Sequence, residues 1–337
     1  MCPAEGVAPI AAQHEPRPEL PVLQGAAEAL LATTVDVVEP LSGGARRDTY
    51  RVIDHAGERY VMRLDHDAAS LEKEVALTHL VAERVPVPRV VGADLAGELA
   101  SVPLTLSVYV EGRSLDEALA AATDEESGAL GDVVGRVLAE IGVFTFEEPG
   151  LLGPALRPRP LDVPLPELLV AMGERVLGES GARDALGTAI ADGFEALLAE
   201  AAPALEPVST QAALVHSDFN GKNLVMAREP DGSPSVAAVF DWEFAFAGPP
   251  LADLGNMLRR QERLPASFVD GFTSGFTAGG GELPPGWRAI AAALDALALL
   301  DFLDRGARGE HGPMFTEACM LIEEAVTRGD LAPPAPA

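Results

Sequence analysis

The stretch VHSDFNGKNLV, residues 215–225, sets a tight polar loop between two short apolar segments. We predict that the apolar residues at each end form strands, since they are short aliphatic runs bounded by turn-forming residues. The loop carries His216, then Asp218 two residues later, and Asn223 five residues after the aspartate. This arrangement suits phosphoryl transfer, in which the protein supplies positioning and charge rather than covalent chemistry.

Phosphoryl transfer needs two kinds of oxygen-bearing side chain. One carboxylate orients the acceptor hydroxyl and accepts its proton, while other oxygens hold Mg²⁺ on the nucleotide phosphates. Asp218 is the candidate for the first role. Asn223 and Asp241, which lies eighteen residues further on within VFDWE, are candidates for the second, because Mg²⁺ takes a few protein oxygens alongside phosphate and water.

These residues resemble the catalytic loop and the metal-binding aspartate of the protein-kinase-like fold. The fuller pattern, HSDFNGKNLV followed by FDWEFA, is closer to the aminoglycoside phosphotransferase family than to protein kinases. A protein kinase would have Arg after the His and Phe-Gly after the metal aspartate, whereas this chain has Ser217 and then Trp242-Glu243. The alternative is that HxD and DWE are chance loop segments. Their joint occurrence, in order and between strands, argues against it.

The resemblance runs from about residue 41 to residue 256 and implies an α+β, protein-kinase-like bilobal fold. A small N-lobe with an antiparallel sheet precedes a larger, mainly helical C-lobe, and 337 residues with 48% hydrophobic content can bury two cores. We expect four segments: a disordered N-terminal segment at 1–18, a nucleotide-binding N-lobe at 19–110, a C-lobe with the catalytic loop and acceptor site at 111–330, and a disordered tail at 331–337.

The charge balance restricts the partners. A net charge of −28 excludes a nucleic-acid-binding protein, because phosphate contacts require a basic surface. The same charge would attract a cationic small-molecule acceptor, although it can equally serve only solubility. Two cysteines exclude a disulfide framework. The sequence shows neither a signal peptide nor a stretch long enough to span a membrane, so we expect a cytoplasmic protein.

Two glycines, Gly43 and Gly44, lie between the predicted strands at 35–41 and 49–54. Without a Cβ, such residues let the backbone approach a ligand. They match the position of the family's nucleotide-binding Gly-rich loop, although the full protein-kinase pattern is missing. A simple hairpin turn is the alternative.

The predicted strand at 59–65 alternates, with Arg63 on the face opposite Tyr60, Met62 and Leu64. In the resembling fold this position holds the cation of the α- and β-phosphates, and Arg can hold phosphate oxygens bidentately. Glu74 in the helix that follows matches the family's partner of that cation. The alternatives are a solvated Arg63 and a solvated helix face.

A further apolar strand, predicted at Leu104–Val110, ends at Glu111-Gly112. In the resembling fold it leads into the hinge between the lobes, whose backbone hydrogen-bonds the purine, so Ser107, Tyr109 and Val110 are candidates for contact with ATP or GTP.

Several C-lobe residues receive roles from the resemblance. His216 would brace the catalytic loop, and Asp253 would support it by accepting its backbone N–H groups. Glu243 would extend the metal shell or act structurally. Asp301 and Asp304 could bind ammonium groups of the acceptor, or form the solvated side of an amphipathic helix.

The predicted function is ATP- or GTP-dependent O-phosphorylation of a small hydroxylated molecule, most simply a cationic antibiotic, which would confer resistance. The alternatives are a metabolic kinase of the choline, homoserine or sugar type, and a non-catalytic nucleotide-binding pseudokinase. The intact Asp218, Asn223 and Asp241 argue against the pseudokinase. The sequence gives no information on the oligomeric state.

Overall fold

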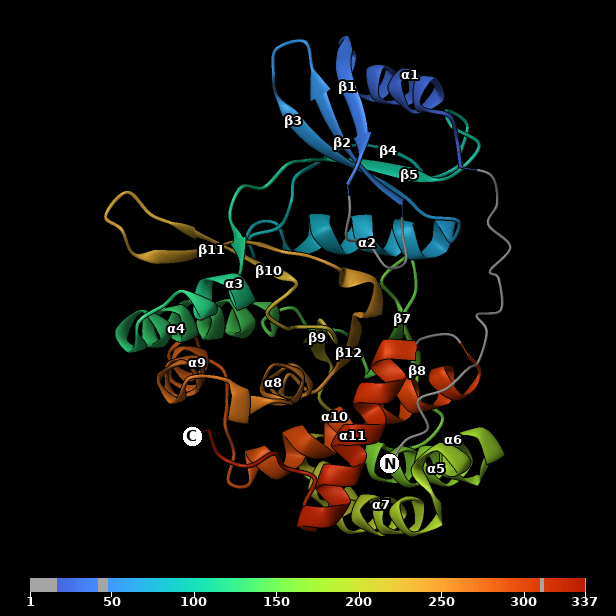
Figure 1. The fold of residues 1–337 in the computed structure, drawn as a ribbon, viewed down its shortest axis with the longest axis vertical. Coiled ribbons are helices and arrows are strands. Elements are labelled where there is room, and N and C mark those ends of the chain that lie inside the picture. Colours follow the sequence, from blue (N-terminus) through green and yellow to red (C-terminus); the bar gives the residue numbers. More distant parts are fainter. Residues whose placement is uncertain (1–16, 42–47, 310–311, 337) are drawn as a thin grey trace.

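The computed structural model describes residues 17–41, 48–309 and 312–336, which form two lobes (Figure 1). The smaller lobe is built on one antiparallel sheet of five strands in the order β1-β2-β3-β5-β4. The expected bilobal α+β architecture is therefore confirmed. The elements of the smaller lobe are α1 (Leu20–Leu31), β1 (Val35–Pro40), β2 (Asp48–Asp54), β3 (Arg59–Leu64), α2 (Ala68–Val81), β4 (Val90–Asp94) and β5 (Leu104–Val108).

The alternation predicted for β3 divides its side chains between the lobe's core and the opposite face. Met62 and Leu64 are buried in the core that this sheet shares with α1. Arg63 points to the other face, where its register partner on β5 is Thr105. Because neighbouring strands present paired residues on the same face, Arg63, Thr105 and, one rung away, Ser107 form a single surface.

Helix α2 connects the two lobes. Its N-cap residue, Asp67, accepts hydrogen bonds from the N–H groups of Ala69 and Ser70, which stabilises the first turn. Further along, Leu77 and Val81 are fully buried in the hydrophobic core of the larger lobe rather than in that of the sheet. The helix that carries Glu74 is therefore fixed to the C-lobe.

The larger lobe is mainly helical, with two small sheets of order β11-β10-β6 and β8-β7-β12-β9. Its helices are α3 (Leu115–Ala120), α4 (Asp124–Ile141), α5 (Leu165–Gly178), α6 (Ser180–Leu186), α7 (Thr188–Ala201), α8 (Leu251–Leu258), α9 (Ala266–Ala278), α10 (Trp287–Ala307) and α11 (Gly312–Arg328), with 3₁₀ turns at Ala202–Val208, Trp242–Phe244 and Gln261–Arg263. Its strands are β6 (Arg113–Ser114), β7 (Gly150–Leu152), β8 (Pro158–Pro160), β9 (Ala213–Val215), β10 (Leu224–Arg228), β11 (Pro234–Val239) and β12 (Phe246–Gly248).

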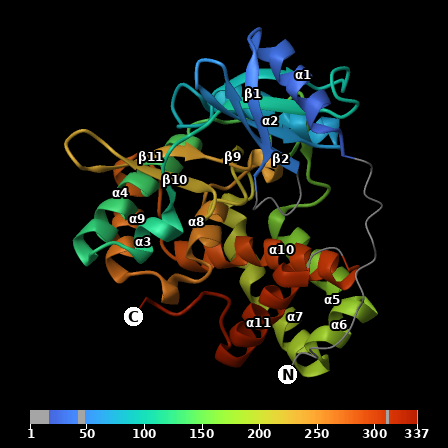
Figure 2. The same ribbon diagram turned by 45° about the horizontal axis from the view of Figure 1, so that its top comes forward.

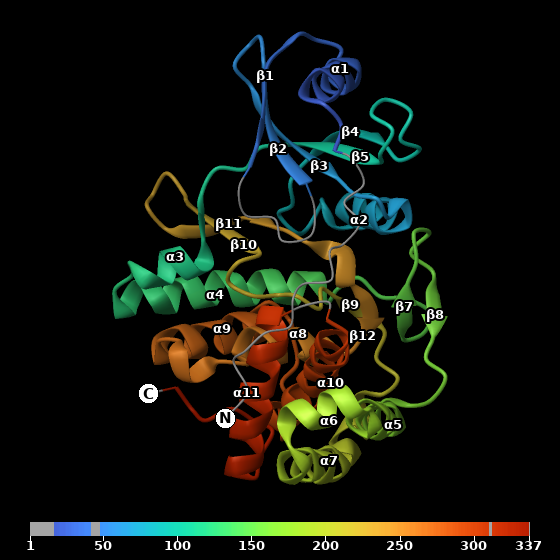
Figure 3. The same cartoon turned by 45° about the vertical axis from the view of Figure 1, so that its right-hand side comes forward.

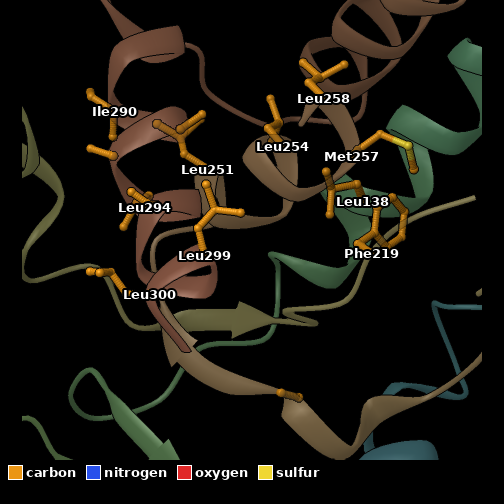
Figure 4. Packing of buried hydrophobic residues seen from close by; sticks show 14 of the residues in the cluster. Leu138, Phe219, Leu251, Leu254, Met257, Leu258, Ile290, Leu294, Leu299 and Leu300 are labelled. Atoms are coloured by element: carbon orange, nitrogen blue, oxygen red, sulfur yellow. The ribbon is translucent and has the colours of Figure 1, made fainter. Parts of the chain in front are cut away.

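The loop between β9 and β10 is anchored in the C-lobe core. Phe219 is fully buried, and Figure 4 shows it beside Leu138 of α4 and Met257 of α8. The residues on either side of Phe219, Asp218 and Asn220, are polar. The buried Phe219 ring therefore anchors the loop to the helices of the C-lobe core.

Helices α4 and α9 pack backbone to backbone through glycines. A Cβ on Gly135 would lie 2.1 Å from the carbonyl oxygen of Phe272, and one on Gly275 would lie 2.1 Å from that of Asp132. Both clashes are with backbone atoms, which cannot move aside as a side chain can. At Gly128, on the same helix α4, the nearest atom to a Cβ would be 3.5 Å away, an ordinary contact.

We therefore expect Gly135→Ala to destabilise the protein by roughly 3 kcal/mol, the cost of overpacking a rigid contact. Gly128→Ala is the matched control and should be neutral or stabilise by up to about 1 kcal/mol, since alanine is the better helix former. The measurement is the urea midpoint of unfolding for both variants. Equal urea midpoints for Gly135→Ala and Gly128→Ala would contradict the close approach of α4 to α9 at Gly135.

The structure adds three features to the C-lobe, the first of which concerns the tail that was expected to be disordered. The tail from residue 331 is anchored as far as it is described, because Gln261 Nε2 donates to the carbonyl oxygens of Pro333 at 3.0 Å and Pro334 at 2.9 Å. The Pro-rich connection at 145–165 contains the β7–β8 hairpin, which stands beside the N-terminal end of α2 (Figure 3). Helices α6 and α7 are separate helices that meet at Gly187, which has φ +78°.

Of the helices that the structure describes, none is long and apolar enough to cross a bilayer.

Candidate active site

The catalytic loop is held from below by Asp253 in the first turn of α8. Its two carboxylate oxygens accept hydrogen bonds from the N–H groups of His216 and Ser217, each at 2.7 Å. Ser217 has φ +71°, an unusual conformation for a residue with a side chain. Burial raises the pKa of Asp253 to about 7, and the two donated N–H groups oppose that rise. The carboxylate thus stabilises a strained turn at the start of the loop.

His216 is fully buried and braces the loop in its neutral form. Its Nε2–H donates to the carbonyl oxygen of Phe240 at 2.8 Å, and its Nδ1 accepts the N–H of Asp218 at 3.2 Å. Burial lowers the pKa of His216 to about 4. Since Nδ1 must accept, the ring carries its single proton on Nε2 and links the loop to the segment before Asp241.

Asp218 lies between two side-chain amides. Asn223 Nδ2 donates to its Oδ2 at 2.7 Å and to its carbonyl oxygen at 2.9 Å, while Asn220 Nδ2 donates to its Oδ1 at 2.7 Å. Burial raises the pKa of Asp218 from its ordinary 3.8 to about 6; the Asn223 bond opposes the rise, and the nearby carboxylates of Asp241 and Glu243 add to it. The amides fix the direction of the carboxylate, and the raised pKa makes it a better proton acceptor than an exposed aspartate.

A base with this pKa predicts a specific pH dependence. Only ionised Asp218 can accept a proton, so kcat/KM for phosphoryl transfer should rise about tenfold per pH unit below pH 6 and level off above it. The measurement is a pH–rate profile with nucleotide and acceptor subsaturating. A profile that stays flat down to pH 5 would contradict this role for Asp218.

Arg63 reaches across the cleft from β3 and joins both lobes. Its Nη1 donates to Glu74 Oε1 on α2 at 2.7 Å, and its Nη2 donates to Asp241 Oδ1 at 2.5 Å. Asp241 itself has φ +62°, a left-handed conformation, and its side chain is 39% exposed to the cleft. The cation expected to position phosphates and the aspartate expected to hold a metal are therefore in direct contact.

Lys73 holds the other end of the segment that contains Asp241. It donates from α2 to the carbonyl oxygen of Ala245 at 2.9 Å, just after the 3₁₀ turn Trp242–Phe244. Burial lowers the pKa of Lys73, and Glu243 and Glu74 oppose this. Two N-lobe cations, Arg63 and Lys73, thus contact the segment from Asp241 to Ala245, one at each end.

Lys73→Met keeps the aliphatic stem and removes the ammonium group. We expect the Mg²⁺ concentration for half-maximal activity to rise roughly tenfold, as for loss of a charge-assisted hydrogen bond, while Lys73→Arg retains most of the wild-type value. A Mg²⁺ titration of the initial rate measures this. An unchanged Mg²⁺ dependence in Lys73→Met would show that the turn is held without Lys73.

These side chains converge on one cavity of about 580 Å³ between the lobes. It brings together Arg63, Glu74, Ser107, Asp218, Asn223, Asp241 and Glu243, as the sequence predicted for one site. The other residues that line it are Thr49, Val61, Leu71, Val75, Thr78, Pro88, Val90, Thr105, Lys222, Val239, Phe240, Trp242, Phe244, Phe302, Arg305 and Met314.

Other predicted site residues lie elsewhere. Tyr109 and Val110 follow β5 beyond the lining, and the N–H of Tyr109 donates to the carbonyl oxygen of Arg59 at 2.9 Å. Gly43 and Gly44 lie outside the described residues.

Asp301 and Asp304 are on α10 but not in the cavity lining. Asp304 is 5% exposed and pairs with Arg175 at 3.1 Å and Arg308 at 3.2 Å. Asp301 pairs with Arg305 at 3.3 Å. These acids were expected to face the acceptor cleft; in the described structure Phe302 and Arg305 of the same helix line the cavity, and the two acids do not.

The structure also adds residues that the sequence did not single out. Asn220 orients Asp218, although an Asn in a polar loop gives no signal of this. Arg259 forms a two-pronged ion pair with Asp295 at 2.7 and 2.9 Å, and its charge opposes the rise in the pKa of Asp218. Only tertiary structure brings Arg259 near the loop.

The oxygen donors at the cleft fit a hard divalent cation. Asn223 Nδ2 is engaged with Asp218, which leaves Asn223 Oδ1 as the amide's free coordinating oxygen. Within residues 17–41, 48–309 and 312–336, no three His, Cys, Asp or Glu side chains are grouped closely enough to hold a metal alone. An ion bound by Asn223 and Asp241 would therefore share its coordination with phosphate and water.

Comparison with known protein families gives one match. Residues 37–305 match the model of the phosphotransferase enzyme family. Comparison with curated protein sequences gives no match.

Solved structures share the fold. An aminoglycoside phosphotransferase APH(4)-Ia in a ternary complex with AMP-PNP and hygromycin B has a TM-score of 0.64 and 20% identity, covering 88% of this chain and 95% of that one. The GDP and kanamycin complex of APH(2")-IIia has a TM-score of 0.68 and 16% identity, covering 92% and 99%. The macrolide 2'-phosphotransferase MphH from Brachybacterium faecium has a TM-score of 0.60 and 18% identity, covering 94% and 99%.

At these identities the solved structures establish only the protein-kinase-like fold. The family match spans most of the sequence and confirms the resemblance seen in the motifs. The chain belongs to the phosphotransferase enzyme family.

Proposed function

We propose that the protein transfers the γ-phosphoryl group of ATP or GTP to a hydroxyl of a small-molecule antibiotic, with Mg²⁺ as cofactor, and so confers resistance. The observation that supports this best is the position of Asp218, fixed by two amides and facing the same cleft as Arg63, Glu74 and Asp241. A nucleotide-binding protein without catalysis would have no need for such an oriented base.

Each residue has a chemical task in the proposed reaction. Asp218 accepts the proton of the acceptor hydroxyl as its oxygen approaches the γ-phosphorus. Arg63, directed by Glu74, positions the phosphates. Asn223 and Asp241 would hold Mg²⁺, with Glu243 as a further candidate beside them. Bound there, the ion neutralises charge on the phosphates.

The nucleotide lies, in this proposal, against the N-lobe surface formed by Arg63, Thr105 and Ser107, with the backbone near Tyr109 and Val110 toward the purine. Relatives bind AMP-PNP in one case and GDP in another, so both ATP and GTP are candidates here. Because both are made and used in the cytoplasm, we place the reaction there.

The test is a coupled nucleotide-turnover assay with Mg-ATP and Mg-GTP against a panel of hydroxylated acceptors. The panel holds aminoglycosides, macrolides, nucleoside antibiotics, choline, homoserine and sugars, and Asp218→Ala is the blank. Acceptor-dependent turnover with an antibiotic supports the proposal. Turnover with choline, homoserine or a sugar would instead assign a metabolic kinase, and nucleotide binding without turnover would favour the pseudokinase.

A further inference from the structure

Lysine is rare in this chain, and both of its lysines lie at the candidate active site. The chain has 24 lysines and arginines, of which only Lys73 and Lys222 are lysine. Lys73 contacts the segment after Asp241 through the carbonyl oxygen of Ala245. Lys222 lines the cavity that also contains Asp218 and Asp241. A chain that otherwise uses arginine for its cations therefore has lysine at two positions around one cleft.

The catalytic loop holds the backbone of Lys222 at a fixed place relative to the candidate base. The side-chain amide of Asn220 joins the two residues, because its Oδ1 accepts the N–H of Lys222 at 3.1 Å and its Nδ2 donates to Asp218 Oδ1 at 2.7 Å. The carbonyl oxygen of Gly221 accepts the N–H of Asp116 on α3 at 3.4 Å. A Cβ on Gly221 would overlap Asp116 Oδ1. These contacts fix where the Lys222 side chain begins.

The ammonium group of Lys222 is not engaged by the protein. Among the residues that the structure describes, none accepts a hydrogen bond from it or forms an ion pair with it. Lys222 is exposed, whereas the next residue, Asn223, is buried. Because lysine carries a compact charge on a flexible four-carbon stem, it can follow a group that moves more readily than the planar fork of arginine can. The loop thus presents an unpaired cation to the cleft.

This cation and Arg63 line the cavity from different lobes. Arg63 extends from β3 and already donates to Glu74 and Asp241. Lys222 belongs to the loop between β9 and β10, which Figure 2 shows below the N-lobe strands and above α8 and α10. Phosphates that extend from Arg63 toward Asp218 would end beside this loop. During transfer, negative charge is spread over the oxygens of the γ-phosphoryl group, so a cation at this end stabilises the group in transit.

We propose that the Lys222 ammonium group donates hydrogen bonds to the γ-phosphoryl oxygens of the bound nucleotide and stays with that group as it moves to the acceptor. The bond from phosphorus to the leaving nucleoside diphosphate breaks, and a bond to the acceptor oxygen forms. Lys222 keeps its proton, while Asp218 takes the proton of the acceptor hydroxyl. Because it requires a nucleoside triphosphate in this cleft, the contact rests on the proposed function.

The first test uses acyl phosphates of ATP and GTP, which carry a butanoyl group on the γ-phosphate. A lysine amine beside that phosphate attacks the acyl carbon and forms an amide, the nucleotide leaves, and the proton that the amine loses passes to solvent. The full chain is treated with the Mg²⁺ complex of each reagent, and peptide mass spectrometry identifies the modified lysine. Lys73 is the internal control, since it binds the carbonyl oxygen of Ala245 and does not line this cavity.

We expect Lys222 to be acylated roughly tenfold faster than Lys73, because the bound reagent holds its acyl group beside Lys222. Excess Mg-AMP-PNP or Mg-GMP-PNP should suppress the reaction. Acylation of Lys222 at a rate that neither nucleotide changes would show only an exposed lysine and would overturn the inference. Preferred acylation of Lys73 would overturn it as well.

The second test separates the γ-phosphate from the rest of the nucleotide. Lys222→Met should bind Mg-AMP-PNP roughly tenfold more weakly than the wild type, as for loss of a charge-assisted hydrogen bond, and Mg-ADP with unchanged affinity, because ADP has no γ-phosphate. Lys222→Arg keeps a permanent cation and should stay within about threefold of the wild type for both. Arg263→Met is the matched control, since its side chain is 64% exposed and outside the cavity lining. Calorimetry measures each dissociation constant.

The results distinguish this contact from the proposed function. Equal losses of affinity for Mg-ADP and Mg-AMP-PNP in Lys222→Met, or no loss for either, would overturn the inference even if the protein phosphorylates an acceptor. A selective loss for Mg-AMP-PNP, without phosphoryl transfer by the wild type to any acceptor in the panel, would support the contact and overturn the proposed function instead.

Discussion

Replacement of Asp218 by alanine is expected to lower kcat for phosphoryl transfer by on the order of 10³-fold, the typical contribution of a positioned general base. Asp218 is the carboxylate held by Asn220 and Asn223, and its removal leaves no proton acceptor at that position. Nucleotide affinity should change little, because the residue proposed to position the phosphates is Arg63, which lies on β3 of the N-lobe and is held there by Glu74. The measurements are single-turnover rate and nucleotide dissociation constant.

Asp218→Asn is the matched variant. It keeps the size of the side chain but cannot accept the hydroxyl proton. Its NH₂ group would also replace one of the two oxygens to which Asn220 Nδ2 and Asn223 Nδ2 donate. It should be as slow as Asp218→Ala. Activity within tenfold of wild type in either variant would mean that another group, or water, takes the proton.

Replacement of Asp241 by asparagine should reduce activity by at least roughly 10²-fold and shift half-saturation by Mg²⁺ to higher concentration, because the carboxylate is the charged oxygen donor at the proposed ion. The substitution also converts the charged contact with Arg63 into a weaker one. Asparagine tolerates the left-handed backbone that this position requires. The fold should therefore persist, and loss of activity can be assigned to the site.

Initial rates over a range of Mg²⁺ concentrations, with circular dichroism as the check on folding, measure the effect. Glu262→Gln serves as a control for removal of a carboxylate charge, since its side chain lies outside the cleft. Wild-type Mg²⁺ dependence in Asp241→Asn would contradict the assignment of Asp241.

The sequence was sufficient for the parts of the site that local pattern determines. Period-two alternation in β3 placed Arg63 opposite Met62 and Leu64, because a strand has only two faces. The motif placed Asp218 and Asn223 in one loop, and in the structure Asn223 Nδ2 donates to Asp218 Oδ2 at 2.7 Å.

Helical phase on α10 was harder to predict. Asp301 and Arg305, four residues apart, pair on one side of α10, and the sequence does not show whether that side or the side of Asp304 faces the cleft. Charge suggested the acids, but burial of Asp304 with Arg175 fixes the helix so that Phe302 and Arg305 face inward. Contacts between residues far apart in the sequence therefore determine which side of α10 faces the cleft.

Long-range contacts also explain the other omissions. Lys73 reaches Ala245 across 172 positions in the chain, and Arg259 acts on Asp218 through a pair with Asp295 on another helix. The tail is held by an amide, Gln261, more than 70 residues away. Pairings of this kind have no local sequence signature.

The measurement that tests the central claim most directly is ³¹P nuclear magnetic resonance of the protein with Mg-ATP or Mg-GTP and each acceptor in turn. We predict a phosphomonoester resonance on one acceptor, formed in step with nucleoside diphosphate and absent with Asp218→Ala. Nucleoside diphosphate that accumulates only with inorganic phosphate, at equal rates in wild type and Asp218→Ala, would contradict phosphoryl transfer to a hydroxyl at this site.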